Sequence, residues 1–444
     1  MRHRPLCYWL ARAGPRDDVR VHASPHSRVV IVGQGYVGLP LAMRAVSVGY
    51  DVIGFDLDPE RVKRLNAGES LVEDVPPDVL CAALESKRYR ASNDPSCCAG
   101  FDVAVIAVPT PLREGVPDLS YIEGAAESLS SHVRPGALVI LESTTYPGTT
   151  EELVAPALEN GSGLVAGTDF HLGYSPERID PGNRTWTFVN TPKVVSGVDE
   201  ASLAAVKAFY DTLVEQTVPV SGTRVAELTK LLENTFRHIN IALVNELAMF
   251  ASDLGIDVWE AIDAASSKPF GFMRFTPGPG AGGHCLPIDP SFLSWRVKRT
   301  LGRQFRFVEL ANDINDHMPD YVVSRLIAAL NRQRKALDGS RILLLGLAYK
   351  RNTRDARESP SLRVAALLLA MGAEVRAADP DVPSDQVDSR IALVEPTDDE
   401  CREADAVVLL VDHDTFDLDA VGRHARYVLD TRNLLAPGAN VERL

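Results

Sequence analysis

The sequence predicts an α/β protein with two doubly wound parallel-sheet domains, joined by a long central helix and a helical middle domain. Two observations predict it: strand, turn, helix and strand patterns occur near both ends of the chain, and a run of apolar residues at helical spacing lies between them. A chain of 444 residues also exceeds what one hydrophobic core usually organises. We therefore expect domains at 27–222, 223–335 and 336–444, after a flexible extension at 1–26.

The first α/β pattern begins at 28–32, an apolar run typical of a buried strand, which ends at Gly33. An amphipathic stretch at 39–48 and a second strand pattern at 51–55 follow. Strand, glycine turn, helix and strand form a βαβ unit. The alternation continues in further apolar runs at 102–108 and 137–141, which favours a parallel sheet.

The middle of the chain has a different pattern. Residues 224–254 carry apolar side chains at helical spacing over about eight turns, without Gly or Pro. They predict one long helix that separates two lobes and offers its outer face to a second subunit. The α/β pattern then returns, with strands expected at 341–346, 373–380, 406–411 and 427–429 and a helix at 361–371.

Composition and charge limit the possible partners and location. The six cysteines are sparse for this length and follow no secretory signal, so we expect no disulfide framework and a cytoplasmic location. The apolar patch at 6–11 is too short for a signal core or a membrane span. A net charge of −14 argues against nucleic acid or an anionic membrane as the main partner. A phosphate ligand must then find a locally basic pocket.

The run GQGYVG supplies Gly33, Gly35 and Gly38 in the GxGxxG spacing, between a strand and a helix. The first glycine permits a tight turn, the second lets a pyrophosphate approach the backbone, and the third lets the helix pack on the strand. Asp56 follows the second strand, where a carboxylate accepts from ribose hydroxyls and repels a 2′-phosphate. The unit is therefore predicted to be Rossmann-like and to bind NAD rather than NADP. Strand, helix and acid together disfavour a glycine turn that serves packing alone.

A second glycine cluster, PGPGAGGHCLPIDP, contains Cys285 where the backbone can approach a ligand closely. A cysteine in such a loop suggests a nucleophile, and the alternative is a small buried apolar residue. Asp289, four residues on, and a separate Lys230 favour the catalytic interpretation. His284 adjoins the cysteine, but adjacent side chains seldom face one another, so we expect a loop residue.

Further polar residues could assist such chemistry. Lys230 and Asn234 lie one turn apart on the predicted long helix, within about 6 Å of each other. They could stabilise an oxyanion together, although helical spacing alone favours a solvated surface pair. Two other segments, LESTTYPGT and GYSPERIDPGN, follow strands of the first lobe, where open α/β sheets place a ligand crevice. They offer Thr144 and Glu177 to hold or activate a water; equally, Glu177 could pair with Arg178 as a structural bridge.

Seven sequence blocks together resemble the UDP-glucose/GDP-mannose dehydrogenase family. They are, in family order, GQGYVGLPLA, VPTPL, SPERIDPG, ELTKLLENTFR, GGHCLPIDP, LAYKRNTRDARESP and DTRN. The segment from 268 to 295 is most similar to the branch that acts on UDP-N-acetylglucosamine. The resemblance implies that 27–222 binds NAD, that 336–444 binds the UDP-sugar, and that the active site lies in the cleft between the two lobes.

The resemblance also implies a two-step oxidation of the sugar hydroxymethyl group to a uronic acid. One NAD takes a hydride, a cysteine captures the aldehyde as a thiohemiacetal, a second NAD oxidises this to a thioester, and water releases the acid. The implied catalytic residues are the nucleophile Cys285, the oxyanion donors Lys230 and Asn234, and the water-positioning groups Asp289, Thr144 and Glu177. The implied cofactor contacts are Gly33, Gly35, Tyr36, Val37, Gly38, Asp56, Arg61, Thr110, Thr144 and Arg357. The implied substrate contacts are Glu177, Arg178, Lys230, Asn234, Phe272, Gly282, Lys350 and Arg432.

Several alternatives stay open. Within the family, the substrate could be UDP-N-acetylmannosamine, UDP-glucose or GDP-mannose. A single-step hydroxyacid dehydrogenase shares a dinucleotide lobe and a long-helix lobe, and would form one NADH per substrate. A non-catalytic sensor of nucleotide sugars would form none. We expect no metal ion, and a homodimer that forms through the long central helix.

Overall fold

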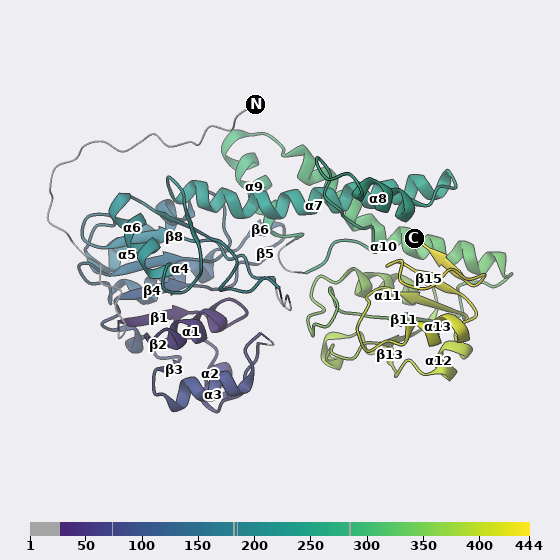
Figure 1. Cartoon of the computed structure of the whole chain (residues 1–444), viewed down its shortest axis with the longest axis horizontal. Helices are drawn as coiled ribbons and strands as arrows, with labels where there is room; N and C mark the ends of the chain where they lie inside the picture. The colour runs from purple at the N-terminus through teal and green to yellow at the C-terminus, as the bar shows by residue number, and fades with distance from the viewer. Residues whose placement is uncertain (1–26, 73, 181–182, 184, 284–285) are drawn as a thin grey trace.

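The computed structural model describes residues 27–72, 74–180, 183, 185–283 and 286–444. The expected extension at 1–26 lies outside them. Figure 1 shows two α/β lobes, the first coloured purple to teal and the second green to yellow, with long helices running above and between them. The predicted fold class is confirmed: both lobes contain a central, mainly parallel sheet, and the predicted long helix is α7 (Thr223–Asp253).

The first lobe is built on an eight-stranded sheet with the order β10-β9-β8-β7-β4-β1-β2-β3. In that order the strands span Thr217–Pro219, Lys193–Gly197, His171–Tyr174, Leu138–Leu141, Val103–Ile106, Arg28–Val32, Asp51–Phe55 and Tyr89–Ser92. The strands from β8 to β3 are parallel, whereas β9 pairs with β8 in the antiparallel sense and β10 is parallel to β9. The first residue of β9 therefore lies at the edge where the parallel strands end.

Helices cover both faces of this sheet. Val29 and Ile31 of β1 pack on one face, in a core with α1 (Gly38–Ser47) and α6 (Glu200–Tyr210). Val30 and Val32 pack on the other face, in a core with α4 (Ser120–Ser130) and α5 (Ala155–Ser162). This alternation explains why the strand is apolar throughout, since a sheet covered on both faces buries every side chain of its central strands. The remaining elements are α2 (Pro59–Asn66), α3 (Pro77–Glu85), the hairpin of β5 (Leu112–Arg113) and β6 (Val116–Pro117), and the single turns η1 (Pro95–Cys98) and η2 (Thr150–Val154).

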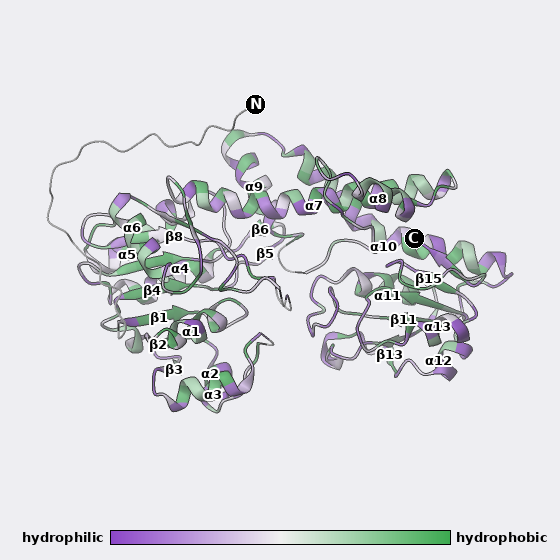
Figure 2. Cartoon of the chain, viewed as in Figure 1, coloured by the Kyte–Doolittle hydropathy of each residue, from purple (hydrophilic) through white to green (hydrophobic). Residues whose placement is uncertain are grey.

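The second lobe has a six-stranded parallel sheet with the order β13-β12-β11-β14-β15-β16. In that order the strands span Ala392–Leu393, Glu374–Ala378, Arg341–Leu345, Ala406–Leu409, Val428–Asp430 and Val441–Arg443. One face packs on α11 (Pro360–Ala370) and the second half of α10 (Arg306–Arg332). The other packs on α12 (Asp398–Glu403) and α13 (Leu418–His424), and η3 (Ser384–Gln386) lies in a connection. Figure 2 shows that the central strands of both lobes are mainly hydrophobic, whereas the helices carry both hydrophobic and hydrophilic residues along their lengths.

Helices α7 and α10 pack on each other between the lobes. Ala242 of α7 contacts Ala311 and Ile314 of α10, and polar pairs continue the contact. His238 Nε2 lies 2.8 Å from Asn312 Oδ1, and Asn245 Nδ2 donates to Asn315 Oδ1 at 2.9 Å. Helix α8 (Val258–Ser266) packs on the far half of α7 and α9 (Asp289–Leu301) on its first half. Among the described helices, none is both long and apolar enough to span a membrane.

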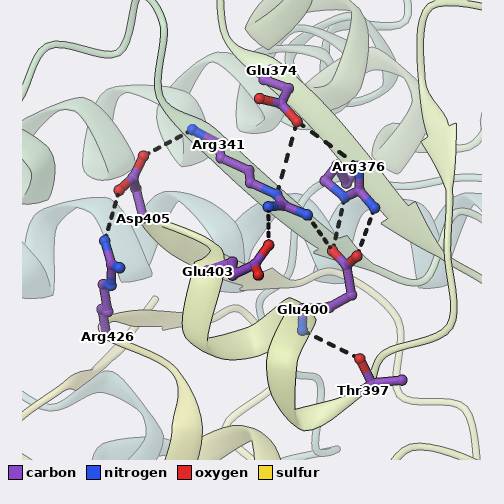
Figure 3. Close-up of polar contacts among 8 residues, drawn as sticks. All are labelled: Arg341, Glu374, Arg376, Thr397, Glu400, Glu403, Asp405 and Arg426. Carbon is purple, nitrogen blue, oxygen red and sulfur yellow. Dashed lines mark hydrogen bonds and ion pairs between the residues drawn. The ribbon is translucent and has the colours of Figure 1, made fainter.

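A charged network ties the amino-terminal edge of the second sheet to α12 (Figure 3). Arg376 of β12 donates to both carboxylate oxygens of Glu400, at 2.6 and 2.8 Å, and Arg341 of β11 donates to the same carboxylate at 3.0 Å. Arg341 also pairs with Glu403, and its backbone N–H donates to Asp405 at 2.9 Å. The hydrogen bonds from Arg376 hold the pKa of Glu400 below its ordinary value. The network lies at the edge of the sheet opposite the loops that face the first lobe. We therefore assign it to the stability of the second lobe rather than to ligand binding.

We expect the Glu400→Gln substitution to lower the free energy of unfolding of the second lobe by about 1–2 kcal/mol at pH 7, because it removes a charge shared by two guanidinium groups. The folded pKa of this carboxyl is depressed, so its contribution is present above the unfolded pKa and is lost as the pH falls through the folded pKa. Denaturant titrations at pH 7 and pH 4 measure both effects. Glu403→Gln is the matched control, since the Glu403 side chain is 61% exposed and, within the part of the chain that the structure describes, forms its ion pair with Arg341. Equal losses for the two variants would contradict the role of Glu400.

Candidate active site

Five polar or glycine positions from the sequence meet at the carboxyl edge of the first sheet. They follow β1, β2, β4, β7 and β8, and are Gly33, Asp56, Thr110, Thr144 and Glu177. Because the strands that precede them are parallel, their carboxyl ends lie on one side of the sheet. Thr110 and Glu177 are buried, and Thr144 is half-buried.

The glycine turn fits a dinucleotide. Gly33 has a φ of +94°, and a methyl group there would lie 2.4 Å from the Ala107 carbonyl oxygen. A methyl group at Gly38 would lie 1.8 Å from the Gly33 oxygen, so this position serves the packing of α1 on β1. At Gly35 the nearest atom would be Arg61 Nη1, at 3.6 Å. The protein itself does not require a glycine there, whereas a pyrophosphate that approaches the backbone does.

Asp56 is held facing the glycine turn. Its carboxylate accepts hydrogen bonds from the backbone N–H groups of Gln34 at 2.8 Å and Asp58 at 3.0 Å. Arg61 Nε lies 3.8 Å from the same carboxylate, and Arg61 Nη1 donates to the Gln34 carbonyl at 3.4 Å. Tyr36 on the turn is exposed and Val37 is half-buried. An acid and a base thus flank the path between the turn and the end of β2, as expected for ribose and pyrophosphate groups.

Arg357, the cofactor contact expected from the second lobe, is paired with Asp355. Its guanidinium donates to both oxygens of this carboxylate, at 2.9 and 2.7 Å. The hydrogen bonds to Asp355 raise the pKa of Arg357, although partial burial acts in the opposite direction.

A cluster of four polar side chains joins the sheet edge to the central helices. Lys230 of α7, 7% exposed, donates from Nζ to the Glu177 carbonyl at 2.6 Å, and Asn234 donates to the carboxylate of Asp289 at the start of α9. The interpretation of Lys230 as a solvated surface residue is therefore wrong. The two donors are bonded to different acceptors, so they do not converge on one oxygen as expected; they lie on the same side of α7 within one cluster.

Burial raises the pKa of both carboxyl groups in this cluster. It raises the pKa of Asp289 to about 6, although Lys230 and Asn234 act in the opposite direction. Burial likewise raises the pKa of Glu177, against the effect of Lys230 and of nearby backbone N–H groups. A raised pKa makes a carboxylate a stronger base, which suits a group that accepts a proton from water.

Arg178 does not pair with the neighbouring Glu177, so that alternative is wrong. Its guanidinium forms an ion pair with Glu233 of α7 and donates to the Pro192 carbonyl at 2.6 Å. The arginine thereby fixes the loop after β8 to the central helix. It leaves the Glu177 side chain to other partners.

The expected nucleophile Cys285 and its neighbour His284 lie outside the described residues. The glycines before them approach the second lobe closely. A methyl group at Gly283 would lie 2.7 Å from the ring of Tyr349, and one at Gly282 would lie 2.6 Å from Pro360 Cδ. The protein's own packing thus accounts for these two glycines, where the sequence suggested approach to a ligand.

The central helix also anchors the glycine-rich loop that precedes Cys285 in the sequence. The Gly278 backbone N–H of this loop donates to the side-chain oxygen of Asn245 of α7 at 3.0 Å. Arg432 of the second lobe lies against Gly278, because a methyl group there would be 2.9 Å from Arg432 Nη1. Its guanidinium also lies 3.5 Å from Asp412. Lys350, also of the second lobe, forms an ion pair with Asp180 of the first lobe at 2.6 Å. Phe272 is 42% exposed. Among the described residues, no group of His, Cys, Asp and Glu side chains could hold a metal ion.

Two buried charged residues were missed by the sequence reasoning. Glu142 follows β7 and Lys193 begins β9, and the two form an ion pair beside Glu177. Their only signal in the sequence is a charged residue directly adjoining an apolar strand, at LVILE and KVVSG. Tyr349 and Asp180 were also missed. Asp180 of the first lobe pairs with Lys350 of the second lobe, and Tyr349 of the second lobe packs on Gly283 of the central region.

Comparison with known proteins identifies the family. Three models of the UDP-glucose/GDP-mannose dehydrogenase family match the chain: the NAD binding domain at 27–214, the central domain at 224–317 and the UDP binding domain at 343–437. Together they cover most of the chain, in the same order as its lobes.

Individual relatives match over nearly their whole lengths. The chain is 36% identical to the UDP-N-acetyl-D-mannosamine dehydrogenase of Pyrococcus horikoshii, over 92% of this chain and 96% of the relative. It is 34% identical to the enzyme of that name from Escherichia coli, over 91% of this chain and 98% of the relative. The structure is similar to that of UDP-D-ManNAc dehydrogenase from P. horikoshii, with a TM-score of 0.85 and 34% identity over 94% of this chain and 98% of that one. A UDP-glucose dehydrogenase from Pyrobaculum islandicum gives a TM-score of 0.81 and 29% identity over 92% and 95%. The chain therefore belongs to the UDP-glucose/GDP-mannose dehydrogenase family and is an NAD-dependent oxidoreductase.

Proposed function

We propose that the protein oxidises the C6 hydroxymethyl group of a UDP-N-acetylhexosamine to a carboxylate in two NAD-dependent steps. The observation that carries the proposal is the cluster of Lys230, Asn234, Asp289 and Glu177 at the carboxyl edge of the first sheet, in which all but the half-buried Asn234 are buried. A cationic donor, an amide donor and two carboxyls of raised pKa are the groups that thioester formation and hydrolysis need. A single-step dehydrogenase would not need the cysteine loop or a second α/β lobe.

The proposed reaction uses one water molecule and two molecules of NAD for each uronic acid formed. NAD supplies the hydride acceptor in both oxidations. In the first, the C6 carbon loses a hydride and its hydroxyl loses a proton, which gives an aldehyde. The Cys285 thiolate adds to that carbonyl carbon, and the oxyanion takes a proton to give a thiohemiacetal. Loss of a second hydride and a proton gives the thioester. Water then attacks the acyl carbon, the C–S bond breaks, and the thiolate and the carboxylate are released.

The residues of the cluster divide this work. Lys230 and Asn234 each keep an N–H donor beyond the one bonded to the Glu177 carbonyl or the Asp289 carboxylate. With these donors they stabilise the oxygen that becomes negative when the thiolate or the water attacks, and one such donor is typically worth about 3–4 kcal/mol. Glu177 and Asp289 accept the proton of the attacking water, with Thr144 as a hydrogen-bond partner at the edge of the sheet. Covalent capture of the aldehyde prevents its escape between the two oxidations.

The lobes divide the binding. The glycine turn holds the NAD pyrophosphate with Gly33, Gly35, Tyr36, Val37 and Gly38. The other contacts proposed for NAD are Asp56, Arg61, Thr110 and Arg357. The second lobe supplies Lys350 and Arg432 to the diphosphate of the sugar nucleotide. The chain has a net charge of −14, so an anionic ligand needs such a locally basic site. Phe272 is the further substrate contact proposed, whereas Arg178 is bound to Glu233 and Gly282 packs on Pro360, so the structure gives no support to the substrate contacts expected of these two. The domains expected at 27–222, 223–335 and 336–444 carry these three parts of the site.

Two sources bear on the acyl group at the sugar nitrogen and on the epimer at C2. The segment at 268–295 is most similar to the branch that acts on UDP-N-acetylglucosamine, whereas the relatives from P. horikoshii and E. coli are named UDP-N-acetyl-D-mannosamine dehydrogenases. Both sources agree on an N-acetylhexosamine attached to UDP. The names of the relatives favour the mannosamine epimer as the first substrate to test. We place the reaction in the cytoplasm, where a catalytic thiol stays reduced.

Assays with UDP-N-acetylmannosamine, UDP-N-acetylglucosamine, UDP-glucose and GDP-mannose test the function. We expect turnover of an N-acetylhexosamine to exceed that of UDP-glucose and GDP-mannose, with two NADH formed per uronic acid. NADH is followed by its absorbance and the acid by mass spectrometry. One NADH per product would reject the thioester route, and no NADH with any of the four would favour a non-catalytic sensor.

We also propose a homodimer that forms through α7. Its outer face carries large apolar side chains at helical spacing that the described chain leaves exposed: Leu243 at 51%, Leu247 at 46%, Phe250 at 56% and Leu254 at 73%. Monomers rarely expose a continuous apolar strip of this kind, so a second copy is the expected cover.

The Leu247→Glu substitution is expected to convert the dimer to a monomer, because it places a charge in the centre of the strip. Sedimentation velocity at micromolar concentration measures the mass. Met371→Glu is the matched control, since Met371 is 46% exposed at the end of α11, away from the strip. If the wild type sediments as a monomer, or the variant keeps the mass of the wild type, the proposed interface is wrong.

A further inference from the structure

A buried ion pair between Lys193 and Glu142 lies next to the Glu177 side chain. Lys193 is 3% exposed and Glu142 is fully buried, and Lys193 Nζ is bonded to Glu142 Oε1. The same Nζ lies 3.7 Å from Glu177 Oε2. Both Glu142 Oε2 and Glu177 Oε2 are buried without a hydrogen-bond partner among the described residues. Lys193 is thus placed between two carboxyl groups, bonded to one oxygen of Glu142 and at ion-pair distance from Glu177.

The reversed strand β9 accounts for this position. Gly173 of β8 is paired with Gly197 of β9, and Tyr174 with Ser196. Continuing that register places position 193 opposite position 177. Because β9 runs against β8, its first residue lies at the carboxyl edge, where Glu142 and Glu177 follow their strands. A parallel strand would place its last residue there instead.

The buried pair of Lys193 and Glu142 contributes little net stability to the fold. Lys193 Nζ lies 5.1 Å from the ring centroid of Tyr210 and 5.5 Å from that of Phe188, and burial, reinforced by Lys230, lowers its pKa well below the ordinary value. Removing an ammonium and a carboxylate from water offsets most of their attraction, so apolar residues of similar volume are often as stable. Lys193 is nevertheless bonded to Glu142 and lies within ion-pair distance of Glu177, so the pair needs a reason other than stability.

The surroundings of Glu177 supply that reason. On one side, Lys230 of α7 donates to its backbone carbonyl; on the other, Lys193 of β9 faces its carboxylate. The nearby guanidinium of Arg178 is bound to Glu233, and the remaining titratable neighbours are acidic or phenolic: Glu142, Asp289, Tyr174 and Tyr210. Lys193 is therefore the cation nearest to the Glu177 carboxylate for which the structure gives an ion pair.

We propose that Lys193, fixed by Glu142, is a positioning residue that orients the Glu177 carboxylate and keeps it ionised for the hydrolysis of the thioester. The proposal rests on the proposed function, because it assigns Lys193 to the water step of that reaction. Lys193 acts only through Glu177 and does not itself contact the substrate.

The Lys193→Met substitution and the double substitution Glu142→Gln with Lys193→Met test the proposal. The double variant removes both members of the pair and leaves no unpaired partner, so it guards against simple unfolding of the single variant. With UDP-N-acetyl-D-mannosamine and NAD in stopped flow, we expect both variants to form two NADH per site in a rapid burst. Steady turnover should then be about 10-fold slower or more, within the range that general base catalysis contributes. Its acid limb should move to higher pH, because the pKa of Glu177 rises when the cation is lost.

Glu142→Gln alone provides a test of the opposite sign. It removes a negative charge but leaves Lys193 facing Glu177, so the acid limb should move to lower pH. The matched control is Lys335→Met, which breaks an ion pair with Asp405 in the second lobe and should change neither the burst nor the limb. A double variant with the steady rate and the acid limb of the wild type would show that the pair is structural only.

Glu177→Gln separates this inference from the proposed function. If Glu177→Gln keeps the steady rate of the wild type, the role of Glu177 fails and the proposed water step fails with it. If Glu177→Gln is slow but the Lys193 variants keep the wild-type rate and limb, only the role of Lys193 fails.

Discussion

The need to pair buried charges at the carboxyl edge of the first sheet governs the arrangement of the site. Lys193 and Lys230 are nearly inaccessible to solvent, as are Glu142, Glu177 and Asp289. An isolated charge in such surroundings is strongly destabilised, so each must lie near an opposite charge or a hydrogen-bond partner. The partners come from the ends of β7 and β8, the start of β9, and the helices α7 and α9. Segments far apart in the sequence are thereby held in one cluster.

Helix α7 connects this cluster of buried charges to the second lobe. Its first half places Lys230 and Asn234 at the sheet edge, and Asn245, four turns farther on, holds the glycine-rich loop that leads to the cysteine. The same helix packs on α10, whose second half belongs to the core of the second lobe. A rigid helix therefore fixes the distance between the dinucleotide turn and the lobe that carries Lys350 and Arg432. The proposed chemistry depends on that spacing, because positioning supplies much of the rate.

The sequence predicted the repeating, local parts of the molecule well. Strands β1, β2 and β11 and the helix α7 are confirmed within a residue or two, because burial on both faces and helical spacing leave clear patterns. The reversal at β9 was not predicted, since strand direction depends on pairing between distant segments. For the same reason the sequence could not reveal that Lys193 meets Glu142, that Arg178 meets Glu233 rather than Glu177, or that Gly283 packs on Tyr349. The proposed role of Cys285 remains a prediction.

In the proposed reaction, water releases an acyl group from Cys285 with the help of the buried Glu177. Mass spectrometry of the Glu177→Gln variant can detect this acyl group after incubation with UDP-N-acetyl-D-mannosamine and NAD, quenching in acid and digestion. We expect the peptide containing Cys285 to carry the added mass of the UDP-sugar acyl group, and the corresponding peptide of Cys285→Ser to carry none. An unmodified Cys285 peptide from a variant that has formed NADH, or an adduct on another residue, would contradict it.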